Sequence, residues 1–120
     1  MEVEPYGLLL ADTGGHYLEG STDITRTVAM GPITDDERDH FTAVLRGHLN
    51  LANAKFLYGC TGINLDYLAR QPLWERGEDF KHGTGHGVGY CLSVHESPNG
   101  FRWKRLPDRN EDAVLEEGMI

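Results

Sequence analysis

Residues 12–27, Asp12-Thr-Gly-Gly-His-Tyr-Leu-Glu-Gly-Ser-Thr-Asp23-Ile-Thr-Arg-Thr27, decide how the first part of the chain folds. The apolar run ahead of them, residues 6–12, predicts a buried strand that enters a tight turn at residues 13–15. Residues 16–29 are rich in Thr, Ile and Val, which is typical of a β-hairpin. We expect its centre near Tyr17 and Leu18, with two antiparallel strands side by side.

Two aspartates of this stretch are candidate ligands. Period-2 alternation over residues 22–30 places Asp23 on the polar face of its strand. Asp12 follows an apolar run, where an ionised carboxylate costs several kcal/mol unless donors or a cation compensate it. Asp12 either accepts from the backbone of Gly14 or Gly15 in a turn, or it binds a cation. A hairpin brings both carboxylates to one face, and two close carboxylates need a shared cation.

Two helices are predicted after the hairpin. Thr34-Asp-Asp-Glu37 forms a capping box, and helical spacing of apolar residues continues to about residue 56. A second amphipathic pattern begins at Ile63 and stops near Gly77. Within it, Asp66 and Arg70 lie four residues apart, which indicates an exposed ion pair worth a few tenths of a kcal/mol or a more specific role.

A glycine-rich segment carries the remaining candidates. In His82-Gly-Thr-Gly-His86-Gly-Val-Gly89 every second residue is Gly, which a helix does not tolerate, so the segment is extended or irregular. Its pattern lacks the Glu of a zincin helix and the spacing of a phosphate loop. Glycines around a histidine let the backbone run close to an ion or substrate. Carboxylate oxygens with an imidazole suit Mn²⁺, Fe²⁺, Co²⁺ or Zn²⁺.

The last part of the chain is expected to add strands. Residues 90–95 alternate like a strand as far as His95, and residues 97–100 predict a turn. Residues 114–120 are typical of a turn that begins another apolar strand. We therefore expect residues 1–120 to be a single unit and a fragment of a longer protein. The fold class is α+β, an antiparallel β-sheet with two helices packed on one face.

The composition excludes several classes of partner. The 120 residues carry 19 Asp and Glu against 11 Lys and Arg, a net charge of −8, which disfavours nucleic acid and anionic membranes. The longest aliphatic run, residues 8–11, is far shorter than a membrane-spanning helix. The acidic N-terminus does not look like a signal peptide. Two cysteines without CxxC spacing fit a reducing, cytoplasmic location.

These motifs together resemble the catalytic domain of the pita-bread metallopeptidases, and within them the cytosolic-type Xaa-Pro aminopeptidases. The resemblance rests on residues 12–27, on the Leu65-Asp-Tyr-Leu-Ala-Arg70 segment, on residues 82–89 and on Val94-His95-Glu96. It covers nearly the whole chain and implies that residues 1–120 are a truncated part of a metallopeptidase catalytic domain, with a partial pita-bread fold. It also implies a metal-dependent aminopeptidase that hydrolyses the bond between an N-terminal residue and a following proline, so its partners are peptides with proline in the second position.

The resemblance assigns roles to five residues. It implies two divalent metal ions, preferably Mn²⁺, with Co²⁺, Fe²⁺ or Zn²⁺ as alternatives. Asp12 would bind one metal, Asp23 would bridge both and His86 would bind the other. His95 matches a histidine near the substrate carbonyl, and His82 matches one that lines the proline side, so both are catalytic candidates.

The resemblance also has consequences for the isolated chain. Two glutamate ligands of the family have no counterpart in residues 1–120, so we expect the chain alone to be inactive. An unpaired sheet edge favours a homodimer. A metal-free pita-bread relative that binds peptides or proteins is the alternative, and methionine aminopeptidase and creatinase share the fold. The metal-free alternative fits less well, because all three ligands that the chain is long enough to contain are present. Methionine aminopeptidase and creatinase fit less well because residues 23–27 and 82–89 have forms that match Xaa-Pro aminopeptidases better.

Overall fold

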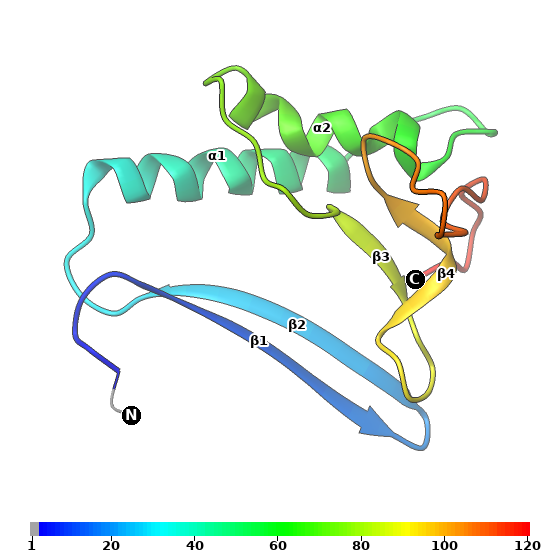
Figure 1. The fold of residues 1–120 in the computed structure, drawn as a ribbon, viewed down its shortest axis with the longest axis horizontal. Coiled ribbons are helices and arrows are strands. Elements are labelled where there is room, and N and C mark those ends of the chain that lie inside the picture. Colours follow the sequence, from blue (N-terminus) through cyan, green and yellow to red (C-terminus); the bar gives the residue numbers. More distant parts are fainter. Residues whose placement is uncertain (1–2) are drawn as a thin grey trace.

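The computed structural model describes residues 3–120 and contains two helices and four strands. In chain order these are β1 (Leu8–Tyr17), β2 (Gly20–Ala29), α1 (Asp35–Ala52), α2 (Gly62–Trp74), β3 (Gly85–Val88) and β4 (His95–Phe101). The helices lie side by side on one side of the molecule, the β1–β2 hairpin lies on the other, and β3 and β4 stand at one end (Figure 1). The predicted α+β class is confirmed. The antiparallel strands form two separate two-stranded sheets, β1–β2 and β3–β4.

The β1–β2 hairpin is longer than the sequence predicts. Its strands pair from Leu8 opposite Ala29 to Tyr17 opposite Gly20, so the turn falls at residues 18–19, next to the predicted centre. The expectation that the first strand ends at Asp12 in a tight turn is wrong, because every residue from 13 to 17 finds a partner in β2.

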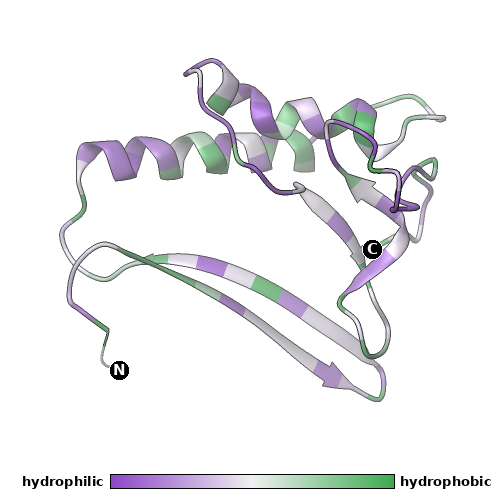
Figure 2. Cartoon of the chain, viewed as in Figure 1, coloured by the Kyte–Doolittle hydropathy of each residue, from purple (hydrophilic) through white to green (hydrophobic). Residues whose placement is uncertain are grey.

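The predicted burial of the first strand is also wrong. Leu8, Leu9 and Leu10 are 38–64% exposed. Leu8 lines a groove of about 650 Å³ between the hairpin and α1, so the helix does not close over this residue in the described part of the chain. Hydrophobic and hydrophilic residues alternate along the hairpin strands (Figure 2). Such alternation is typical of a sheet that packs against a core on one face.

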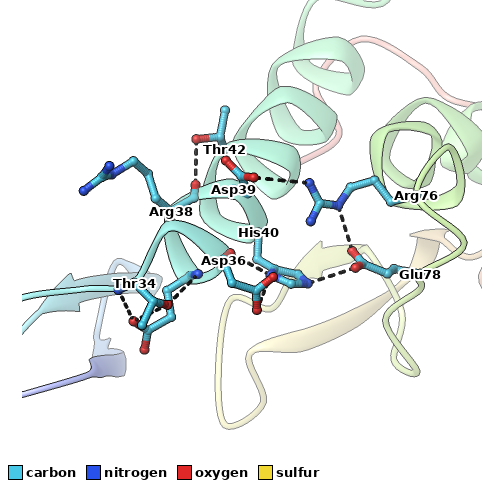
Figure 3. Close-up of polar contacts among 9 residues, drawn as sticks. Thr34, Asp36, Arg38, Asp39, His40, Thr42, Arg76 and Glu78 are labelled. Carbon is cyan, nitrogen blue, oxygen red and sulfur yellow. Dashed lines mark hydrogen bonds and ion pairs between the residues drawn. The ribbon is translucent and has the colours of Figure 1, made fainter.

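Helix α1 begins at the predicted capping box. The Thr34 hydroxyl accepts from the Glu37 N–H at 3.1 Å, and the Glu37 carboxylate accepts from the Thr34 N–H at 2.7 Å (Figure 3). The backbone hydrogen bond from Thr34 lowers the pKa of Glu37. The helix ends at Ala52, four residues before the expected limit, where the N–H of Asn53 donates to the Leu49 carbonyl. In residues 3–120 neither helix has the length and apolar character needed to cross a membrane.

The core lies between the two helices. Its apolar members are Ala43, Leu65, Ala69 and Leu73. Gly47 of α1 meets the backbone of Ala69 of α2, and a Cβ at position 47 would collide with that carbonyl. Glycine is therefore required there by close helix packing rather than by backbone conformation.

Ion pairs join α1 to the loop after α2. The ring nitrogen Nε2 of His40 lies 3.1 Å from Glu78, and Arg76 reaches both Glu78, at 3.0 Å, and Asp39, at 4.0 Å (Figure 3). The backbone hydrogen bond to Asp36 and the nearby carboxylates of Glu78 and Asp36 raise the pKa of His40. This network fixes the start of the loop that leads from α2 to the glycine-rich segment.

The second sheet differs from the sequence prediction at two places. Residues 90–94 form an irregular connection, so the strand predicted over residues 90–95 is wrong and β4 begins only at His95. The predicted turn at residues 97–100 is also wrong, because this segment belongs to β4. There Glu96 pairs with Gly87 and Gly100 pairs with His86, so residues 97–99 bulge out of the ladder. Pro98 has no N–H to donate, which suits a bulge.

Candidate metal centre

The hairpin register brings the two candidate aspartates to one face. Asp12 pairs with Thr25, and Asp23 pairs with Gly14, so the two carboxylates are diagonal neighbours across β1 and β2. The Thr25 hydroxyl donates to Oδ1 of Asp12 at 2.9 Å. The alternative in which Asp12 caps a turn at Gly14 or Gly15 is excluded, because those residues continue the strand.

The tip of this hairpin is attached to the loop between β3 and β4. The Tyr90 hydroxyl donates to the Leu18 carbonyl, and the Ser21 hydroxyl donates to the Tyr90 carbonyl at 3.3 Å. These contacts join segments about seventy residues apart in sequence. They hold β2 against β3 and so determine where Asp23 meets the glycine-rich segment.

His86 is directed at Asp23 from β3. Its Nε2 lies 3.3 Å from Oδ2 of Asp23, and the two side chains are 25% and 24% exposed. Its other ring nitrogen, Nδ1, lies 2.9 Å from the Gly87 carbonyl and donates to it. The neutral ring with its proton on Nδ1 turns the lone pair of Nε2 towards this carboxylate oxygen, and two such acceptor atoms can share a cation, whereas the protonated ring forms an ion pair with Asp23.

His95 stands beside His86 without contacting the aspartates. The ring centroids of the two histidines are 4.0 Å apart, and the rings are inclined at 71°. His95 begins β4 and pairs with Val88, so the neighbouring strand β3 presents His86 next to it. One pocket of about 370 Å³ is lined by Asp12, Asp23, His86 and His95, together with His16, Thr22, Thr25, Gly14 and Val94.

The donor set fits part of a metal centre. The carboxylates of Asp12 and Asp23 and the imidazole of His86 line the same pocket, and such donors suit Mn²⁺ and related divalent ions. Yet within residues 3–120 no three His, Cys, Asp or Glu side chains stand close enough to form a complete metal-binding group. Asp23 is in contact with His86, whereas Asp12 is bonded to Thr25. The pocket therefore has donor atoms suited to a divalent cation, but residues 3–120 contain no complete set of ligands.

His82 lies outside this pocket. Its Nδ1 contacts the Gly83 carbonyl at 2.7 Å, and its ring is exposed and stacks near Phe80, with centroids 4.9 Å apart. The structure thus brings together four of the five candidate residues and places the fifth at the entrance to the glycine-rich segment.

The sequence interpretation missed a buried charge network behind that segment. Asp66 and Arg70 are 0% and 1% exposed, so the expected exposed ion pair is wrong. Arg70 donates to Asp66 at 2.6 Å and to Asp79 at 2.8 Å. Residues 66, 69, 70 and 73 share one helix face, and the apolar members of that face, Ala69 and Leu73, were the signal that both charges point inward. Burial opposes ionisation of Asp79, but the Arg70 hydrogen bond and charge outweigh it and lower the pKa of Asp79.

Comparison with known proteins identifies the family. The model of metallopeptidase family M24 matches residues 1–120. Aminopeptidase P1 of Lotus japonicus is 47% identical over 118 residues, which cover 97% of this chain and 18% of that protein. Aminopeptidase P1 of Arabidopsis thaliana is 52% identical over 98 residues, or 82% of this chain and 15% of that protein. The chain thus spans less than a fifth of the length of these relatives.

Solved structures agree with this relationship. The X-prolyl aminopeptidase of Caenorhabditis elegans, described as a cytosolic enzyme with a di-nuclear active site, matches with a TM-score of 0.74 and 52% identity over 78% of this chain and 15% of its own. The prolidase of Pyrococcus horikoshii matches with a TM-score of 0.76 and 33% identity over 99% of this chain and 32% of its own. The helices and strands described above are part of a pita-bread fold, and the chain belongs to metallopeptidase family M24.

Proposed function

We propose that this chain forms part of the active site of a metal-dependent aminopeptidase that hydrolyses the bond between an N-terminal residue and a following proline. The observation that carries the proposal is the convergence of Asp23, His86 and His95, with Asp12 beside them, on one pocket. The similarity to proteins named aminopeptidase P and Xaa-Pro aminopeptidase supports the proline preference.

Asp12, Asp23 and His86 would hold two divalent cations, with Mn²⁺ as the preferred metal and Co²⁺, Fe²⁺ or Zn²⁺ as alternatives. Bound divalent cations supply an acidified water and a polarised substrate carbonyl. Thr25 orients the Asp12 carboxylate by donating to Oδ1, and the Gly87 carbonyl fixes the proton of His86 on Nδ1. These contacts leave Oδ2 of Asp12 and Nε2 of His86 free to face the pocket.

His95 would act on the substrate rather than on the metals. Its ring lies against His86 at the edge of the pocket and makes no contact with either aspartate among the interactions that the structure describes. We expect its N–H to donate to the oxygen that becomes negative as the scissile carbonyl is attacked, or to move a proton at that stage. His82 would line the side that receives proline.

The proposal extends to the molecule's setting. We place the enzyme in the cytoplasm, in keeping with the free thiols of Cys60 and Cys91 and with the description of the C. elegans relative as cytosolic. We also propose a homodimer, and we expect the isolated 120-residue chain to be inactive. Sedimentation of the full-length protein that contains this chain tests the dimer directly.

A second candidate function is a peptide-binding module without metals. One observation favours it: the described residues contain no complete metal-binding group. The two functions differ in their products. A binding module retains an Xaa-Pro peptide and leaves it intact, whereas the peptidase releases the first residue.

Peptide hydrolysis by the full-length protein tests the proposal. With Mn²⁺ present, we expect release of the N-terminal residue from an Xaa-Pro-Xaa peptide and much slower release from the matched Xaa-Ala-Xaa peptide. His95→Ala is expected to lower kcat by about 10²- to 10⁴-fold, because it removes a group that acts on the transition state. Asp35→Asn is the matched control, since Asp35 is a 95% exposed carboxylate on α1 far from the pocket residues in sequence. Equal cleavage of the two peptides would contradict the proline preference.

A further inference from the structure

Arg70 is a buried cation that contacts the chain in four places. Besides Asp66 and Asp79, its guanidinium donates to the Phe80 carbonyl at 2.8 Å and to the His82 carbonyl at 2.9 Å. Three of the four acceptors therefore belong to residues 79–82, the segment that enters the glycine-rich stretch. A planar guanidinium with several donors in a fixed arrangement can hold such a segment in one geometry, which a lysine cannot.

Phe80 transmits this restraint to a side chain. The Arg70 guanidinium carbon lies 3.9 Å from the centroid of the Phe80 ring, a cation–π contact. The His82 imidazole also lies beside that ring, with centroids 4.9 Å apart and an interplanar angle of 30°. Arg70, Phe80 and His82 thus form a continuous stack from the protein interior to the exposed surface.

The position of the His82 ring is consequently set from two directions. Arg70 fixes the backbone through the His82 carbonyl, and Phe80 supports the ring from one side. The ring nitrogen Nδ1 contacts the Gly83 carbonyl at 2.7 Å and donates to it, which leaves Nε2 as the nitrogen available to a ligand. An exposed imidazole can rotate about two side-chain bonds, and the contacts of His82 with the Gly83 carbonyl and the Phe80 ring restrict that rotation.

We propose that Arg70 is a positioning residue that holds His82, through the 79–82 backbone and the Phe80 ring, in the one orientation in which it can contact substrate. The catalytic consequence rests on the proposed peptidase function, whereas the restraint on residues 79–82 does not. Arg70 itself is buried, and its described contacts, with Asp66, Asp79, Phe80 and His82, include none of the residues that line the pocket, so its effect on the reaction is exerted through His82.

Hydrogen–deuterium exchange and kinetics of the full-length protein test this proposal together. The variants are Arg70→Lys, which keeps the charge but loses the planar fork, and Phe80→Leu, which removes only the ring support. Phe80→Tyr restores an aromatic ring, and Arg38→Lys is the control, because Arg38 is a 62% exposed arginine with one ion-pair partner. Exchange is measured by mass spectrometry on a peptide that covers residues 79–84, with a peptide from α1 as internal reference.

We expect Arg70→Lys to speed exchange at residues 79–84 while the α1 peptide is unchanged, and to lower kcat by about 10- to 100-fold with KM within about threefold. Phe80→Leu should lower kcat with a smaller effect on exchange, and Phe80→Tyr should restore it. Arg38→Lys should change neither quantity. If Arg70→Lys does not fold, the contrast between Phe80→Leu and Phe80→Tyr carries the test.

Two results would overturn the proposal: unchanged exchange at residues 79–84 in Arg70→Lys, or faster exchange with kcat close to that of the unmodified protein. A protein that hydrolyses no Xaa-Pro peptide in any form would refute the proposed function instead. In that case the exchange measurement still decides whether Arg70 holds this segment.

Discussion

Replacing Arg70 by methionine removes the one partner that a fully buried carboxylate has among residues 3–120, and its effect can be estimated from the structure. Asp66 is 0% exposed, its Oδ2 is bonded to Arg70 at 2.6 Å, and its Oδ1 has no partner among the described residues. Methionine keeps much of the arginine stem but no charge. An uncompensated buried charge of this kind costs about 3–5 kcal/mol of unfolding free energy.

Urea unfolding followed by tryptophan fluorescence measures this loss, because Trp74 ends the helix that carries Arg70. With a urea dependence of about 1–3 kcal/mol per M, the midpoint should fall by about 2 M. Arg38→Met is the matched control. Arg38 is 62% exposed and pairs only with Asp35 on the helix surface, so we expect a loss of at most about 1 kcal/mol.

A double variant sharpens the test. Asp66→Asn combined with Arg70→Met removes the buried negative charge together with its partner, so the double variant should be more stable than Arg70→Met alone. Similar midpoints for Arg70→Met and Arg38→Met, or a double variant less stable than Arg70→Met, would refute the view that Arg70 compensates a buried charge.

Three further predictions follow from the helices and their loops. Thr34→Ala removes the capping box of α1 and should cost about 1 kcal/mol in urea unfolding, whereas Thr34→Ser should cost little; equal losses would argue against the cap. Gly47→Val adds atoms where the helices touch and should cost about 1–3 kcal/mol, so an unchanged midpoint would contradict the close packing. The pKa of Asp79 is lowered in the folded state, so ionised Asp79 adds to the unfolding free energy above the ordinary pKa of 3.8, and this addition is lost as pH falls through the folded pKa. Asp79→Asn should therefore weaken the fall of unfolding free energy at acid pH. An unchanged fall would contradict the Arg70 contact.

The parts of the fold that follow local rules could be predicted from the sequence. The capping box at Thr34 fixed the start of α1, because its two hydrogen bonds involve residues three apart. A hairpin centred near Tyr17 and Leu18 and the common face of Asp12 and Asp23 were also predicted, and alternation over residues 22–30 placed Asp23 on the polar face, although the length of the first strand was not. Glycines at every second position of residues 82–89 excluded a helix there, and β3 lies in that stretch.

The errors lie where long-range contacts override local preference. Residues 13–15 look like a turn in isolation, but pairing with β2 keeps them extended. Residues 97–100 also have turn chemistry, and they form a bulge in β4 because Asn99 bridges to Asp112 and the Pro98 carbonyl accepts from Ala113. No local pattern contains that information.

The candidate site also combines residues that local sequence patterns predict with contacts that they do not. Residue types and spacing singled out Asp12, Asp23 and His86, but the distance of 3.3 Å between His86 and Asp23 depends on docking of the hairpin tip by Tyr90. Tyr90 was not distinguishable as a site residue, because its partner at Leu18 is 72 positions away. Burial of Arg70 likewise depends on where the 79–82 segment packs.

Metal binding by the full-length protein tests the central claim most directly, namely that Asp12, Asp23 and His86 are metal ligands. The protein is dialysed against a series of Mn²⁺ concentrations, and the bound metal is measured by elemental mass spectrometry. The unmodified protein is compared with Asp23→Asn and with the exposed control Asp35→Asn. We predict that Asp23→Asn lowers Mn²⁺ affinity by at least about 10-fold, since it removes a charged ligand, while Asp35→Asn binds as the unmodified protein does. Undiminished Mn²⁺ binding by a folded Asp23→Asn variant would contradict the claim.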